Sequence, residues 1–262
     1  MRIIDFHTHI FPDKIADKTI SHLAEVCREK PHTNGKKDGL LQSMEEAEIS
    51  CSVILPVVTN PSQFASICRF AETFQEEPLI SFGGIHPDST DYKEELRQIK
   101  SLGMKGIKLH PDYQNTYFND IRYKRILSYA SELDLIVSVH AGLDPLCPED
   151  IHCTPKMALE VIREVQPTKL VLAHMGGNAL YDESETYLMG EDVYLDTSYV
   201  LDKMDRQQFV RMVRGHGADR VLFASDSPWA GQKEFVTYFD TLGLTEEEKE
   251  KILYKNADKL LK

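Results

Sequence analysis

The sequence predicts a single (β/α)8 TIM barrel over residues 1–262, and three observations lead to that fold class. Short apolar runs alternate with longer amphipathic runs along the whole chain. Eight of the apolar runs are rich in Val, Ile and Leu, as expected for parallel strands buried on both faces. The length of 262 residues is close to the roughly 250 that such a barrel needs.

The expected strands are the eight nearly continuous apolar runs. They cover 2–7, 51–57, 79–85, 104–110, 135–140, 169–174, 192–196 and 220–225. Because helical runs separate them, the strands should pair in parallel through right-handed crossovers. The first strand is not followed by a glycine-rich phosphate loop, which disfavours a dinucleotide-binding sheet.

The expected helices show apolar residues at helical spacing. They cover 13–29, 40–48, 62–76, 91–102, 120–133, 154–165, 178–188, 202–214, 232–242 and 245–261. Suitable N-cap residues begin four of them: Asp13, Ser62, Thr154 before a proline, and Thr245 with Glu248 three residues later.

Composition excludes several classes of protein. The net charge of −12 disfavours nucleic acid and anionic membranes as partners. No apolar run of about 18 residues indicates a membrane span or a signal peptide. The five cysteines form no CxxC pair, so we expect reduced thiols in a cytoplasmic protein. Cys147, His152 and Cys153 form only a weak candidate ligand cluster.

Six of the ten histidines follow one positional rule. They are His7, His9, His86, His110, His140 and His174. Each lies at or just past the C-terminal end of an expected strand. In a barrel these ends converge on the face that carries active sites.

The first strand and three later ones end in groups that suit a metal. His7 and His9 are two residues apart, so they share a face of the first strand. His140 and His174 each end an apolar run, where a buried hydrogen-bonded histidine is the alternative. Asp226 ends the last run and needs a partner, which is a metal, an arginine or a helix N-terminus.

The order of these motifs resembles the amidohydrolase superfamily, in particular the amidohydrolase-related branch that includes aminocarboxymuconate-semialdehyde decarboxylase. The stretches that carry the resemblance are 4–9 (IDFHTH), 106–111 (GIKLHP), 172–177 (LAHMGG), 223–229 (FASDSPW) and 252–257 (ILYKNA). The nucleases of the TatD-like group are a neighbouring alternative because residues 84–87 (GIHP) match one of their motifs. The fourth strand lacks their metal-bridging glutamate, and the acidic net charge disfavours a DNA substrate.

The resemblance implies roles for these residues. His7, His9, His140 and Asp226 would bind one divalent metal, with zinc expected and manganese, iron or cobalt as alternatives. His174 would be the catalytic histidine, and Asp226 would also take a proton from the metal-activated water. Lys108 is the candidate for a carboxylated lysine that bridges two metals, and a buried ion pair with a carboxylate such as Asp5 is the other interpretation.

Substrate contacts should come from the loops that follow the strands. The candidates are His86, His110, Tyr113 and Trp229. The two histidines precede prolines and could instead shape their turns, and Trp229 could cap the rim.

Three functional hypotheses follow. The first is a hydrolase that acts on an amide, ester or lactone of a small metabolite. The second is a non-oxidative decarboxylase or hydratase of a small aromatic or unsaturated carboxylic acid. The third is a non-catalytic barrel that binds a metal or ligand. The oligomeric state stays open, and a homodimer is one candidate because dimers are common among the relatives.

Overall fold

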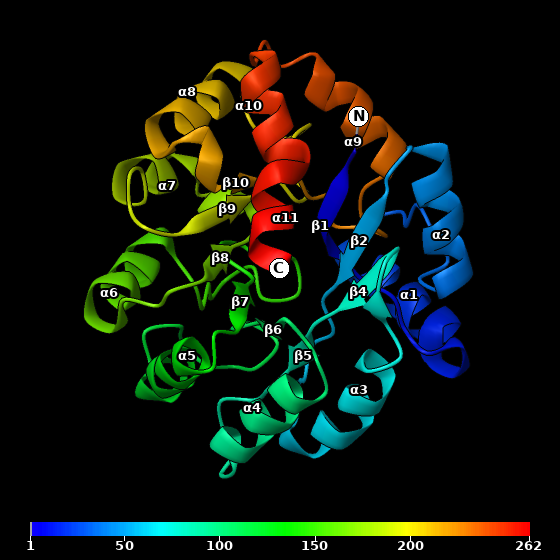
Figure 1. Cartoon of the computed structure of the whole chain (residues 1–262), viewed down its shortest axis with the longest axis vertical. Coiled ribbons are helices and arrows are strands. Elements are labelled where there is room, and N and C mark those ends of the chain that lie inside the picture. The colour runs from blue at the N-terminus through cyan, green and yellow to red at the C-terminus, as the bar shows by residue number, and fades with distance from the viewer. Residues whose placement is uncertain (1) are drawn as a thin grey trace. The chain divides into compact units, whose positions relative to one another are not determined.

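Residues 2–262 are described by a computed structural model of the chain, shown in Figure 1. They form two compact units. Within the described residues, unit 1 comprises 2–54, Glu76–Ile80 and Asp196–Lys262. Unit 2 comprises Leu55–Gln75 and Ser81–Leu195. Short strands and longer helices alternate in both units.

Unit 1 is built around three strands and the helices that follow them. Its elements are β1 (Ile4–Thr8), α1 (Asp13–Cys27), α2 (Lys37–Glu46), β2 (Cys51–Ile54), α8 (Arg206–His216), η3 (Ala218–Arg220), β10 (Val221–Leu222), α9 (Gln232–Asp240), α10 (Glu246–Glu250), the π-helical η4 (Lys251–Lys255) and α11 (Asn256–Leu261). Strands β1 and β2 pair in parallel, and Figure 1 shows them side by side. The segment after β10 lies against β1, since the Phe6 N–H donates to the Phe223 carbonyl at 2.9 Å.

Unit 2 contains a run of parallel strands in the order β5, β6, β7, β8 and β9. Its elements are η1 (Pro61–Gln63), α3 (Phe64–Ala71), β5 (Gly83–Gly84), α4 (Tyr92–Ser101), β6 (Gly106–Leu109), α5 (Ile121–Glu132), β7 (Ile136–Val139), α6 (Pro155–Val165), β8 (Leu170–Leu172), η2 (His174–Gly176), α7 (Tyr181–Tyr187) and β9 (Tyr194–Asp196). Two further strands, β3 (Gln75–Glu76) and β4 (Leu79–Ser81), contain the residues at which the sequence changes from unit 2 to unit 1 and back.

All eight expected strands are present, but the third is divided into β4 and β5. Glycine is required at the end of β5, because a Cβ on Gly84 would lie 2.8 Å from Val58 Cγ2 and 3.0 Å from the Pro56 carbonyl. The helix expected to reach residue 76 ends at Ala71, and the chain then forms the unpredicted β3.

Two of the four expected N-caps are confirmed. Thr154 accepts from the Met157 N–H, and Thr245 forms a capping box with Glu248. The other two predictions are wrong. Pro12 occupies the N-cap position before Asp13, and Asn60 caps the turn that contains Ser62 because its side chain accepts the Ser62 N–H.

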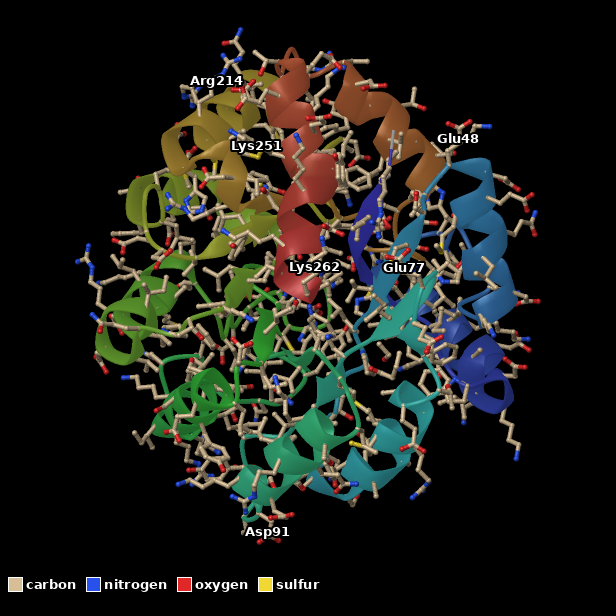
Figure 2. All side chains as sticks on the ribbon, in the orientation of Figure 1. Glu48, Glu77, Asp91, Arg214, Lys251 and Lys262 are labelled. Carbon is tan, nitrogen blue, oxygen red and sulfur yellow. The ribbon has the colours of Figure 1, made fainter. Side chains whose placement is uncertain are left out.

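Charged side chains occupy the surface of each unit. The labelled Arg214 and Lys251 of Figure 2 point outward from their helices and pair with Glu248 and Glu247. All five cysteines are free, as expected from the sequence. Within residues 2–262, no helix has both the length and the apolar character to cross a membrane.

Candidate metal and catalytic residues

His7 and His9 are presented by the end of β1. His7 is 1% exposed and lies within the strand, and His9 follows its last residue. Asp226 comes from the loop after β10. Two backbone hydrogen bonds join that loop to β1: the Asp226 N–H donates to the His7 carbonyl at 2.9 Å, and the His9 N–H donates to the Ser227 carbonyl at 2.7 Å. The three side chains therefore start from backbone positions that are tied to each other.

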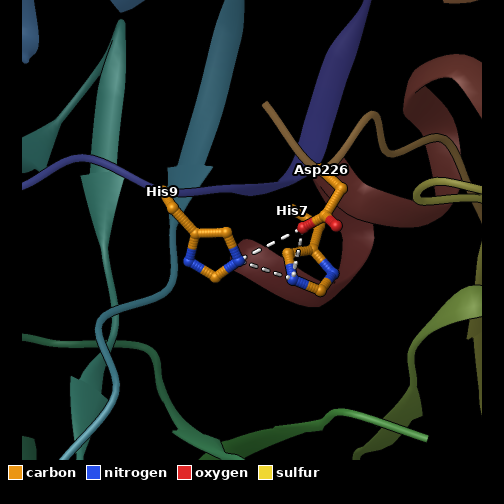
Figure 3. Close-up of side chains that lie close together, drawn as sticks. All are labelled: His7, His9 and Asp226. Carbon is orange, nitrogen blue, oxygen red and sulfur yellow. Dashed lines mark hydrogen bonds and ion pairs between the residues drawn. The ribbon is translucent and has the colours of Figure 1, made fainter. Parts of the chain in front are cut away.

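The three side chains converge on one point, as Figure 3 shows. Nε2 of His7 lies 3.1 Å from Nε2 of His9 and 3.4 Å from Oδ1 of Asp226, and His9 Nε2 lies 3.2 Å from the same oxygen. A metal with bonds of about 2.1 Å has ligand–ligand edges of about 3.0 Å in an octahedron and about 3.4 Å in a tetrahedron. These three atoms thus form a triangle of the size that a divalent metal requires.

His7 is fixed by hydrogen bonds on the opposite side of its ring. Its Nδ1 lies 3.0 Å from Asp196 Oδ2 and 3.0 Å from Ser198 Oγ, and Asp196 is fully buried. Because a carboxylate only accepts hydrogen bonds, the proton of the neutral ring is placed on Nδ1, which leaves the Nε2 lone pair facing His9 and Asp226. Metal-binding histidines are commonly oriented in this way.

Asp5 couples β1 to the loop that carries Asp226. Its buried carboxylate accepts from the Ser225 N–H at 2.9 Å, the Ser225 hydroxyl at 2.5 Å, Gln232 Nε2 at 2.8 Å and the His7 N–H at 3.2 Å. Burial raises the pKa of Asp5 to about 6, although these hydrogen bonds act in the opposite direction. The carboxylate of Asp5 is therefore structural and holds the loop in place. Asp226 itself adopts a strained left-handed conformation with φ 75°.

Four of the expected site residues come together in unit 2. His140 follows β7, His110 follows β6, and His174 begins η2. His174 Nε2 lies 3.0 Å from His140 Nδ1, so one ring donates a hydrogen bond to the other. The His110 ring stacks between those of Tyr113 and His140, at centroid distances of 3.7 and 4.2 Å.

The remaining candidates occupy more separate positions. His86 follows β5 and is buried, and desolvation lowers its pKa. Lys108 is 1% exposed in β6, opposite Ser138 of β7. Trp229 is half-buried in the loop after Asp226. Cys147, His152 and Cys153 do not form one of the two groups of potential metal ligands found among residues 2–262.

Sequence reasoning missed four buried residues around these sites: Asp196, Ser198, Asp112 and Asp144. Asp196 could have been found, since it ends an apolar run as Asp226 does and needs a partner for the same reason. Asp112 and Asp144 lie in loops without a regular pattern, so only tertiary structure brings them to His140.

Comparisons with known proteins give a consistent result. The family model described as amidohydrolase matches residues 4–262. None of the curated proteins matches the sequence. An uncharacterised TIM-barrel protein from Bordetella bronchiseptica is 18% identical with a TM-score of 0.76, and the match covers 100% of this chain and 98% of that chain.

Two enzyme structures are also similar. A dihydroxybenzoic acid decarboxylase from Polaromonas, with bound manganese and 2-nitroresorcinol, is 17% identical with a TM-score of 0.74, covering 99% of this chain and 96% of that chain. A probable 2-pyrone-4,6-dicarboxylic acid hydrolase from Acinetobacter baumannii, with bound citric acid, is 17% identical with a TM-score of 0.67. The match covers 100% of this chain and 99% of that chain. These likenesses show that the chain has the α/β TIM-barrel fold expected from its sequence.

Proposed function

Because this chain belongs to the amidohydrolase family, we propose that it is a metal-dependent enzyme that acts on a small aromatic or unsaturated carboxylic acid. The observation that carries the proposal is the triangle of His7 Nε2, His9 Nε2 and Asp226 Oδ1, with edges of 3.1 to 3.4 Å. Nitrogen and oxygen ligands of this kind suit manganese, iron, cobalt and zinc. The expectation that His140 is a fourth ligand stays a prediction.

We propose non-oxidative decarboxylation as the reaction. The bond between a substrate carbon and its carboxylate breaks, carbon dioxide leaves, and the carbon takes up a proton. The bound metal would act as a Lewis acid on a substrate oxygen and lower the pKa of bound water. The dihydroxybenzoic acid decarboxylase, which has a very similar fold, supports this choice of reaction and of substrate class.

The chain's own residues can hold and move the proton. His174 is buried, and its Nε2 is 3.0 Å from His140 Nδ1, so a proton can pass between the two rings. We propose His174 as the proton carrier and Asp226 as the metal-binding carboxylate. The stacked rings of His110 and Tyr113 are proposed contacts for a planar substrate. His86 and Trp229 are proposed as further substrate contacts.

Hydrolysis is the second candidate function. The fold likeness to a probable hydrolase of a pyrone dicarboxylic acid supports it, and the same metal ligands serve both reactions. In hydrolysis, the oxygen of water adds to the substrate carbonyl carbon and the leaving group takes up a proton. Decarboxylation releases carbon dioxide and hydrolysis does not.

One assay separates the hypotheses. Protein loaded with manganese or zinc is incubated with dihydroxybenzoic acids and with pyrone carboxylic acids. Carbon dioxide and the organic products are then measured, with His9→Ala as the inactive control. Carbon dioxide release that falls at least about 100-fold in the variant supports decarboxylation. Ring-opened acid without carbon dioxide supports hydrolysis. No conversion of either class, in protein shown to contain metal, would refute this substrate class and favour a non-catalytic metal-binding barrel.

A further inference from the structure

Two neighbouring strands of unit 2 lead into the same short sequence. Residues 85–88 (IHPD) follow β5, and residues 109–112 (LHPD) begin at the last residue of β6. The strands pair in parallel, and His86 and His110 are each the second residue after the last paired position (Figure 1). Because neighbouring parallel strands end at one edge of a sheet, both histidines leave the sheet at the same edge. We call these two segments the His–Pro turns.

Each His–Pro turn holds its imidazole with a backbone N–H. Nδ1 of His86 accepts from the Asp88 N–H at 3.1 Å, and Nδ1 of His110 accepts from the Tyr113 N–H at 3.4 Å. A backbone N–H only donates, so the proton of each neutral ring lies on Nε2. Both histidines are buried. These local bonds orient each ring within its own turn, but they do not fix one turn relative to the other.

The side-chain amide of Gln114 joins the two His–Pro turns. Its Nε2 donates to the Ile85 carbonyl, directly before His86, at 2.7 Å. Its Oε1 accepts from the His110 N–H at 3.2 Å. The same Nε2 also donates to the Val58 carbonyl at 2.8 Å. One amide therefore spans three separate segments of unit 2, and two of them carry the proposed substrate contacts.

All four hydrogen-bonding positions of the Gln114 amide are used. The Tyr123 hydroxyl donates to Oε1 at 2.7 Å, so both amide hydrogens and both oxygen lone pairs have partners. The partners also fix which way the amide points, because backbone carbonyls only accept and the His110 N–H only donates. Gln114 is 3% exposed. Its removal would leave several buried groups without a partner, which makes this amide hard to replace.

The backbone of Gln114 is also tied to His110. The Gln114 N–H donates to the His110 carbonyl at 3.0 Å, and the Thr116 hydroxyl donates to the Gln114 carbonyl at 3.0 Å. His110 thus gives its N–H to the side chain of Gln114 and accepts the N–H of the same residue. Any displacement of Gln114 is passed directly to His110.

We propose that Gln114 is a positioning residue that sets the spacing of His86 and His110 for substrate binding. The inference rests on the proposed function, in which both imidazoles contact the substrate. Contacts made equally in the ground state and the transition state lower KM and leave kcat unchanged. Loss of the Gln114 amide should therefore raise KM and affect kcat much less.

Kinetics of Gln114→Met test this split, because methionine keeps the length of the side chain and removes all four hydrogen bonds. The matched control is Gln75→Met. The Gln75 amide donates to the Ala71 and Ser81 carbonyls at 2.7 and 3.2 Å, and both acceptors lie outside the His–Pro turns. With metal-loaded protein and a dihydroxybenzoic acid, we expect KM to rise at least about 10-fold in Gln114→Met, with kcat within about threefold. Gln75→Met should keep the wild-type KM.

Histidine side-chain NMR gives a readout that does not depend on turnover. Long-range ¹H–¹⁵N spectra of the zinc-loaded protein report the Nδ1 and Nε2 shifts of each ring, and the variants His86→Asn and His110→Asn assign the signals. In the wild type, both rings should carry their proton on Nε2. Gln114→Met should shift the signals of both rings, and Gln75→Met should leave them in place.

Circular dichroism shows whether each variant folds, and Gln114→Glu replaces Gln114→Met if the latter does not. A carboxylate keeps the acceptor for the His110 N–H and loses both donors, so the His86 signals should then shift more than those of His110. Unchanged signals of both rings, equal changes in Gln75→Met, or an unchanged KM in an active Gln114 variant would overturn the inference. A wild type without turnover would refute the proposed function, and the NMR comparison alone would then uphold or overturn the positioning of the two rings.

Discussion

Replacement of Asp196 by asparagine should weaken metal binding at His7 without unfolding the protein. Asp196 Oδ2 accepts from His7 Nδ1 at 3.0 Å, and the side chains are 0% and 1% exposed. Asparagine can keep a hydrogen bond from Nδ1, but the bond is no longer assisted by a negative charge. Asp196 also accepts from the Ser198 N–H at 3.0 Å through its other oxygen, Oδ1. An asparagine whose carbonyl oxygen faces His7 places its amide nitrogen toward this N–H, so the Ser198 bond is lost.

The magnitude follows from the hydrogen bond that changes. A bond to a charged group contributes about 1.5–3 kcal/mol, and a neutral bond contributes about 0.5–1.5 kcal/mol. The difference of about 1–1.5 kcal/mol corresponds to an affinity loss of about 5- to 15-fold. Asp196→Ala should cost about 100-fold, the upper end for residues that orient metal ligands, because the buried His7 N–H then loses its acceptor.

Competitive titration against a chromophoric chelator gives the metal Kd. It is done with metal-stripped wild-type and variant proteins. Asp192→Asn is the matched control because Asp192 is exposed just before β9, and its Kd should equal that of the parent. An Asp196→Asn variant with the parent's affinity would show that the Asp196 contact does not tune His7.

Three further predictions follow from other parts of the molecule. Asp120 caps α5, and its hydrogen bonds with the Arg122 side chain and N–H lower its pKa to about 2. Asp120→Ala should cost about 1 kcal/mol of unfolding free energy at pH 7, and Asp120→Asn should cost less. Because a lowered carboxyl pKa stabilises the fold only above the unfolded pKa, the difference in unfolding free energy between wild type and variant should vanish between about pH 4 and pH 2 in urea titrations. Burial raises the pKa of Cys51 and Cys68 to about 12. Neither thiol should therefore react with iodoacetamide at about pH 8 until urea is added. Rapid labelling of either cysteine in the native protein, detected by mass spectrometry, would contradict this prediction. A Cβ at Gly142 would lie 2.0 Å from the Asn178 backbone nitrogen, whereas a Cβ at Gly103, which has a similar positive φ, would have no atom within 4 Å. Thermal unfolding should therefore show that Gly142→Ala is destabilised by at least about 2 kcal/mol more than Gly103→Ala.

Much of the fold could be predicted from local pattern. The apolar runs gave the strands because burial on both faces requires nearly continuous Val, Ile and Leu. The errors have local causes. Asn60 competes with Ser62 for the same cap, and the strand predicted at 79–85 is interrupted at Phe82, between β4 and β5.

The candidate site was only partly predictable. The spacing of His7 and His9 places both on one face of β1, and the position of Asp226 at the end of an apolar run marks it as a ligand candidate. The partners that orient these ligands are distant in sequence: Asp196 is 189 residues from His7. Such pairs depend on tertiary packing. The carboxylates of Asp112 and Asp144 were missed because irregular loops carry no periodic signal.

We propose that His7, His9 and Asp226 together hold a divalent metal. The most direct test is a crystal structure of the manganese-soaked protein, with anomalous difference maps measured above and below the manganese absorption edge. We predict an anomalous peak about 2.1–2.3 Å from His7 Nε2, His9 Nε2 and Asp226 Oδ1 at once. Absence of a peak there at full manganese loading, or a peak bound without His7 and His9, would contradict the assignment of these residues as metal ligands.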